Sequence, residues 1–123
     1  MKIICLSNEI ELTQNNRPYI SRIDSIIKDK EYAAYGMILF QNELQYIVND
    51  EFNMATWYPS KNFKLIDNEF NPDWLFQYYG DKLGIEAIWG YEELVNNPQH
   101  YKGLIEKDEQ EIKRFMEIKN IDK

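Results

Sequence analysis

Apolar and polar residues alternate through residues 31–66, and short groups of turn-forming residues interrupt the alternation. A period of two is typical of β-strands that bury one face. The interruptions divide the run into four strands, at residues 32–40, 44–48, 54–58 and 63–66. Connections as short as these force neighbouring strands to pair antiparallel.

The N-terminal residues have a less regular pattern. Residues 1–6 predict a first strand, and the polar residues 7–18 predict a loop. Over residues 19–28, apolar side chains recur at one-, three- and four-residue steps, which favours one or two turns of amphipathic helix. The β-branched and aromatic residues in this stretch lose side-chain freedom in a helix, so a strand is the competing interpretation.

Three short motifs resemble those of small SH3-like barrel proteins of bacteria and their phages. They are Lys30-Glu31-Tyr32, then Tyr46-Ile47-Val48-Asn49-Asp50, then Trp57-Tyr58-Pro59-Ser60 with Phe63. The resemblance covers residues 1–67 and implies a small antiparallel barrel. The chain departs from that pattern in its long insert at residues 7–30. A fold resemblance of this kind implies no activity.

The C-terminal half has a different organisation. Alternating aromatic residues over 74–91 predict a β-hairpin, although Asp73 is also suited to cap a short helix through Tyr79. From Tyr91 the spacing becomes helical, and Pro98 begins a second short helix at the position that proline favours. Asp108 begins the last helix.

Together these patterns predict an α+β fold in one domain over residues 1–123. An SH3-like antiparallel β-barrel occupies residues 1–67, and a β-hairpin and two or three helices at residues 68–123 pack against it. A single domain is also what 123 residues favour.

Charge is distributed unevenly along the chain. The formal net charge is −7, of which residues 1–66 contribute −1 and residues 67–123 contribute −6. A negative field repels phosphate backbones and favours basic protein surfaces. The alternative is that the charge only maintains solubility. The first residues contain one lysine and a short apolar run before two glutamates, which does not fit a signal peptide, and no apolar run is long enough to cross a membrane. We therefore expect a cytoplasmic protein.

The sequence contains no recognisable catalytic, metal or cofactor motif. Its only cysteine, Cys5, lies between apolar neighbours and is expected to be an inert core thiol. Its only histidine, His100, excludes metal sites that need two or three histidines, and we expect it at the surface or an interface. The five glycines form no phosphate-binding loop. These features predict a protein that is not an enzyme and carries no cofactor.

Aromatic residues are the strongest indication of binding. Residues 74–91 hold six of them, and together with Trp57 and Tyr58 they exceed what strand alternation alone can bury on one face. Tyrosine and tryptophan are favoured at interfaces, but burial between barrel and helices would also account for them. The candidate binding residues are Tyr32, Trp57, Tyr58, Trp74, Tyr78, Tyr79, Trp89, Glu109 and Glu111.

The preferred hypothesis is a non-enzymatic accessory protein of bacterial or phage origin that binds another protein. A basic partner surface is favoured, as for immunity- or inhibitor-type proteins that neutralise their target. The alternative is an SH3-like barrel that binds single-stranded nucleic acid by stacking aromatic side chains on bases. The chain has no basic stripe to hold a phosphate backbone, so nucleic acid is the less favoured partner. The sequence leaves the oligomeric state and the partner's identity open.

Overall fold

A computed structural model describes residues 1–82 and 84–121 of the chain. Along these residues the elements follow in the order β1 (Lys2–Cys5), β2 (Glu9–Gln14), β3 (Arg17–Arg22), β4 (Glu31–Ala33), β5 (Gly36–Phe40), β6 (Glu43–Asn49), β7 (Ala55–Pro59), the 3-10 turn η1 (Ser60–Asn62), β8 (Phe63–Asp67), β9 (Leu75–Lys82), β10 (Ile85–Gly90), α1 (Glu92–Asn96), α2 (Pro98–Ile105) and α3 (Glu109–Ile121).

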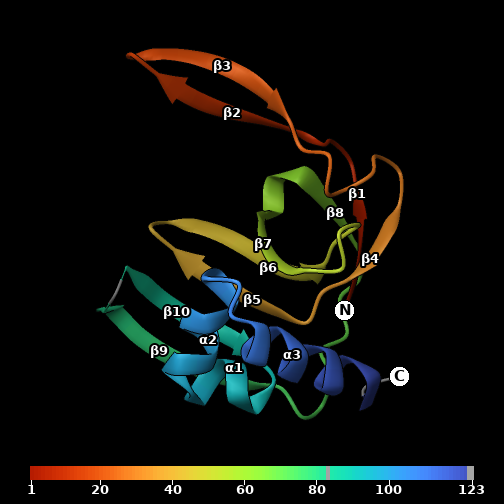
Figure 1. Cartoon of the computed structure of the whole chain (residues 1–123), viewed down its shortest axis with the longest axis vertical. Coiled ribbons are helices and arrows are strands. Elements are labelled where there is room, and N and C mark those ends of the chain that lie inside the picture. The colour runs from red at the N-terminus through yellow and green to blue at the C-terminus, as the bar shows by residue number, and fades with distance from the viewer. Residues whose placement is uncertain (83, 122–123) are drawn as a thin grey trace.

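The strands form three antiparallel sheets. A three-stranded sheet has the order β4-β1-β8, a five-stranded sheet has the order β7-β6-β5-β10-β9, and β2 pairs with β3 alone. The helices lie together on one side of the five-stranded sheet, whereas the β2–β3 hairpin projects away from the rest of the molecule (Figure 1). This arrangement confirms the α+β class. Among the described residues, strand pairing leaves the sheets open and does not close them into a barrel.

Two hydrophobic cores share the five-stranded sheet. The first joins it to the three-stranded sheet and includes Ile3, Cys5, Tyr32, Met37, Tyr46, Val48, Tyr58 and Phe63. The second joins it to the helices and includes Ile38, Ile47, Ala55, Ile88, Leu94, Val95, Leu104 and Phe115. Successive residues of β6 therefore point into different cores: Tyr46 and Val48 into the first and Ile47 into the second. Burial on both faces explains the nearly continuous apolar runs in β5 and β6.

Residues 31–66 form five strands rather than the four predicted. The prediction for residues 32–40 missed a break at Ala34 and Tyr35, where the chain leaves the three-stranded sheet and enters the five-stranded one. The turn between β5 and β6 is formed by Gln41 and Asn42, which both have positive φ. Such a two-residue turn matches the twist of a hairpin.

The predictions for residues 7–28 were largely wrong. Residues 9–22 form the β2–β3 hairpin instead of a loop and a helical segment, so the strand interpretation made for residues 19–28 holds for residues 19–22. Asn15 and Asn16 have φ of 53° and 62° and form the turn. Asparagine tolerates this conformation, and the β-branched and aromatic residues that follow favour a strand.

The C-terminal predictions were confirmed. Strands β9 and β10 pair antiparallel as the predicted hairpin, and three helices follow. Asn97 accepts a hydrogen bond from the Gln99 backbone, and Pro98 occupies the first turn of α2. The Asp108 carboxylate accepts hydrogen bonds from the backbone N–H groups of Gln110 and Glu111, and so caps α3. No helix within the described residues is both long and apolar enough to cross a membrane.

A pair of glycines sets how closely α1 approaches the sheet. Gly36 of β5 pairs with Gly90 of β10, and Leu94 of α1 lies against both. A Cβ atom at Gly36 would lie 2.5 Å from Leu94 Cδ2 and 2.8 Å from the Trp89 carbonyl oxygen. The absence of a side chain at this position is therefore what allows the helix to pack here.

Candidate functional site

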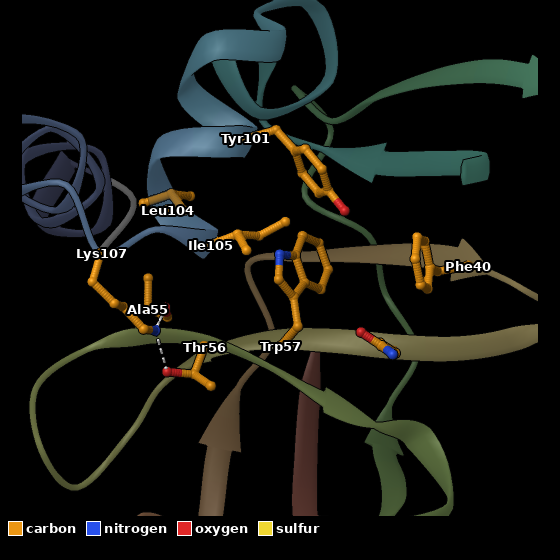
Figure 2. Close-up of a pocket in the computed structure, with 9 residues that line it drawn as sticks. Phe40, Ala55, Thr56, Trp57, Tyr101, Leu104, Ile105 and Lys107 are labelled. Atoms are coloured by element: carbon orange, nitrogen blue, oxygen red, sulfur yellow. Dashed lines mark hydrogen bonds between the residues drawn. The ribbon is translucent and has the colours of Figure 1, made fainter. Parts of the chain in front are cut away.

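An open, mainly apolar pocket lies between strand β7 and the C-terminal end of α2 (Figure 2). Its volume is about 530 Å³. It is lined by Phe40, Gln45, Ala55, Thr56, Trp57, Tyr101, Leu104, Ile105 and Lys107. We call it the Trp57 pocket. An apolar concavity with a few well-placed polar groups is the usual form of a binding site.

Lys107 supplies the charge in this pocket. Its φ of 59° turns the chain at the end of α2 and directs its ammonium group back to β7. There Nζ donates hydrogen bonds to the Ala55 carbonyl oxygen at 2.6 Å and to Thr56 Oγ1 at 2.8 Å. Burial lowers the pKa of Lys107, and the charge of nearby Asp50 opposes that shift. An ammonium has three donors, so one N–H remains beyond these two bonds.

Trp57 forms the centre of the pocket. Its indole lies 6.1 Å from the Tyr101 ring, centroid to centroid, and Ile105 lies on the side of the indole nitrogen (Figure 2). Nε1 is buried, and no described group accepts its hydrogen bond. A buried donor without a partner costs about 1–3 kcal/mol, and a ligand would recover part of that cost only by displacing the side chains that cover Nε1. Burial, followed by the charge of Tyr79, raises the pKa of Tyr101 to about 12.

Acidic side chains lie just beyond the Lys107 side of the pocket, at the corner between α2 and α3. Glu106, Asp108 and Glu109 are all exposed there. Lys107 lies between Glu106 and Asp108 in sequence, but its ammonium group points inward and is bound to β7. We call these three acids the acidic corner. It places negative charge next to an apolar pocket, and Lys102 Nζ, 3.9 Å from Glu106 Oε1, offsets part of that charge.

A second, smaller groove lies between β7 and the β2–β3 hairpin. Its volume is about 410 Å³, and Ile10, Leu12, Ile23 and Pro59 are among the residues that line it. Trp57 lines both this groove and the Trp57 pocket. The edge strand β7 therefore has a hollow on each side.

His100 is buried, which corrects the prediction of a surface or interface histidine. Its side chain is fully enclosed, with Nε2 2.6 Å from the Tyr91 hydroxyl oxygen and Nδ1 2.5 Å from Glu111 Oε2. A histidine between a carboxylate and a hydroxyl is an arrangement that enzymes use. Here neither His100 nor Tyr91 lines the Trp57 pocket. Burial raises the pKa of Tyr91, and the charges of Glu93 and Glu111 add to the effect. The cluster ties α2 and α3 to the end of β10.

Two of the candidate binding residues lie inside the first core. Tyr32 donates a hydrogen bond to Glu51 Oε2 at 2.7 Å and accepts one from the Ile27 backbone. Tyr58 donates to Asp50 Oδ2 at 2.8 Å. Both residues are buried, with 6% and 5% of their surface exposed, so they hold the turns of the sheet and offer little surface for binding. Cys5 is buried in the same core, as predicted, and burial raises the pKa of its thiol.

The remaining candidates are divided between packing and exposure. Tyr79 donates to the Val95 carbonyl oxygen, and Trp89 is half-buried against Phe76. Trp74 is half-buried and stacks on Phe70, whereas Tyr78 is 71% exposed. Of the two glutamates, Glu109 is exposed and Glu111 is bound to His100. Burial on both faces of the sheet thus accounts for part of the aromatic surplus, and an exposed part remains on β9.

The sequence-based argument did not include Phe40, Tyr101 or Lys107 among the site residues. Tyr101, Leu104 and Ile105 share a helical face in the sequence pattern, which is the signal that could have indicated a pocket wall. Within the described part of the chain, no three His, Cys, Asp or Glu residues gather to hold a metal ion. In comparisons with known proteins, no family model, curated protein or solved structure matches this chain.

Proposed function

We propose that this protein is a non-enzymatic accessory protein that binds another protein through the Trp57 pocket and the acidic corner. The observation that carries the proposal is an open aromatic pocket with an unsatisfied buried donor, Trp57 Nε1, beside three exposed acids. The preferred partner has an apolar or aromatic side chain flanked by lysine or arginine. We further propose that the protein acts in the cytoplasm of a bacterium, or during phage infection, and neutralises its basic partner.

Insertion of a partner side chain fits the edge of β7 better than addition of a strand. At one end of β7 the Ala55 carbonyl oxygen already accepts a hydrogen bond from Lys107 Nζ, and at the other end Pro59 has no N–H to donate to an added strand. Lysine and proline at an edge are common protections against strand pairing. An inserted aromatic or aliphatic side chain would instead pack on Trp57 and Tyr101. Buried anchors of this kind contribute most of the binding energy at protein interfaces.

The order of the strands supports an SH3-like arrangement as part of the proposal. The β2–β3 hairpin follows the first strand, β5, β6 and β7 form a meander, and a 3-10 turn leads to β8, which pairs with β1. SH3-like barrels often bind extended peptides across aromatic grooves. The grooves on both sides of β7, with Trp57 in each, are the corresponding surface here.

The experiment compares partner capture by matched variants of the purified protein. Glu106→Lys with Glu109→Lys reverses charge at the acidic corner, and Glu69→Lys with Asp73→Lys makes the same change in net charge at exposed positions elsewhere. Ile105→Glu places a charge at the rim of the pocket, and Ile66→Glu, at a residue of similar exposure on β8, is its control. The control variants leave helix caps and buried pairs untouched.

We expect the wild type and both controls to retain the same basic protein from the source cell at low salt, and the two site variants to lose it. Equal retention by the site variants and their controls would overturn the proposal. Binding to a single-stranded oligonucleotide that weakens with salt, without protein capture, would favour the nucleic-acid alternative instead.

A further inference from the structure

Residues 75–80 of strand β9 form an exposed and uncharged part of the edge of the five-stranded sheet. The strand pairs only with β10 among the described strands, and its other side faces outward (Figure 1). Leu75, Phe76 and Tyr78 are 41%, 54% and 71% exposed. Residues 74–80 contain no charged side chain and no proline. An apolar edge segment without charge or proline is a template for pairing with another strand.

The regular part of this edge is short and has a defined centre. Gly80 has a φ of 59°, and the register between β9 and β10 shifts beyond Tyr78. Gly80 is the first residue of β9 with a positive φ, and Gln77 lies in the middle of the five residues before it, Leu75 to Tyr79. The sequence is nearly symmetric about Gln77. Its two neighbours, Phe76 and Tyr78, are both aromatic, and the next residues outward, Leu75 and Tyr79, are both large and mainly apolar.

We propose that β9 pairs antiparallel with β9 of a second copy of this chain, around a two-fold axis at Gln77. In that register Phe76 lies opposite Tyr78 of the other copy, and Leu75 lies opposite Tyr79, while the two Gln77 side chains face each other. Aromatic cross-strand pairs of this kind stabilise antiparallel pairing. A two-fold interface requires a self-complementary surface, and the pattern around Gln77 meets that requirement.

The absence of charge favours a second copy as the partner, and the small area indicates a weak dimer. Each copy carries a net charge of −7, so two copies can approach closely only where the surface is uncharged, as it is along residues 74–80. The exposed parts of the three apolar side chains amount to roughly 300 Å² per copy. That is less than the ~800 Å² per partner of a standard interface, so the dimer should depend on concentration. This surface is separate from the Trp57 pocket, and the two proposals can fail independently.

The test uses opposite charges at the two-fold axis. Gln77→Lys and Gln77→Glu each place like charges opposite one another in a homodimer, and an equal mixture places opposite charges there. Gln14→Lys and Gln14→Glu, at an exposed position on β2, are the matched controls. Native mass spectrometry and sedimentation are measured from about 1 μM to 1 mM, the range expected for an interface of this size. Circular dichroism checks that each variant is folded.

We expect the wild type and the Gln14 variants to form dimers with the same dissociation constant. Each Gln77 variant alone should show a dissociation constant raised about fivefold or more, and the Gln77 mixture should form heterodimers in excess of the statistical share. A wild type that stays monomeric over the whole range would overturn the proposal. So would a dimer whose dissociation constant neither Gln77 variant changes.

Discussion

Gly36→Ala tests the packing that fixes α1 on the five-stranded sheet. The new Cβ would lie 2.5 Å from Leu94 Cδ2, about 1 Å closer than an ordinary van der Waals contact, and the nearby Trp89 carbonyl leaves it no room on the other side. Leu94 is buried and packed on several sides. Overpacking of this kind costs about 1–3 kcal/mol.

Alanine also restricts the unfolded chain more than glycine does, which offsets about 0.4–1 kcal/mol of that cost. We therefore expect the free energy of unfolding to fall by about 1–2 kcal/mol, or the melting temperature to fall by roughly 4 °C per kcal/mol. Urea denaturation followed by circular dichroism measures the change. The slope of the denaturation curve should stay unchanged, because the fold is retained.

A double-mutant cycle identifies the cause. Leu94→Ala alone removes a buried side chain and should cost about 2–5 kcal/mol. In the double variant the alanine at 36 gains the space that Leu94 vacates, so the total loss should be at least ~0.5 kcal/mol smaller than the sum of the single losses. Leu104→Ala, at a residue equally buried on α2, is the control and should combine additively with Gly36→Ala. Strict additivity with Leu94→Ala would refute the reasoning.

Two further predictions concern titration and reactivity. The hydrogen bond from Arg114 Nε at 2.6 Å, together with the charge of that guanidinium, lowers the pKa of the Glu93 carboxyl. A lowered pKa in the folded state stabilises the protein above the unfolded-state pKa, and the contribution is lost as pH falls through the lowered value. Glu93→Gln should therefore reduce the difference between the free energies of unfolding at pH 7 and pH 3, measured by urea denaturation. The reduction is small, because solvent screens this partly exposed pair. An unchanged difference would contradict the prediction. Cys5 should react with a thiol reagent roughly 10³-fold more slowly in the native protein than in urea, because its thiol is exposed only on unfolding. Comparable rates would show that the Cys5 thiol is accessible in the folded protein.

Local patterns allowed much of the fold to be predicted. The meander of β5, β6 and β7 was predictable because strand alternation and short turns act between neighbours in sequence. Helices α2 and α3 were predictable for the same reason, since Asn97 and Asp108 cap the turns that follow them directly. The β2–β3 hairpin was missed although its signal was local: Asn15 and Asn16 form its turn, and alternating residues flank them.

The candidate site could not be predicted in the same way, because its parts meet only through tertiary packing. Trp57 and Tyr101 are far apart in sequence and come together because α2 packs on the helix-facing side of the sheet. His100 contacts Tyr91 and Glu111 across three elements, so its burial could not be read from its neighbours in sequence. Composition indicated surplus aromatic residues, but the packing of the three-stranded sheet and the helices on the two faces of the five-stranded sheet decides which of them remain exposed.

The most direct test of the account is hydrogen–deuterium exchange of the protein alone and in complex with its captured partner. The account predicts slower exchange in the complex at residues 55–59 of β7 and 101–109 around the end of α2, because the partner covers the Trp57 pocket and the acidic corner. Residues 75–79 of β9 should change only with protein concentration. Protection confined to other surfaces, with unchanged exchange at both pocket segments, would contradict the central claim that the Trp57 pocket receives the partner.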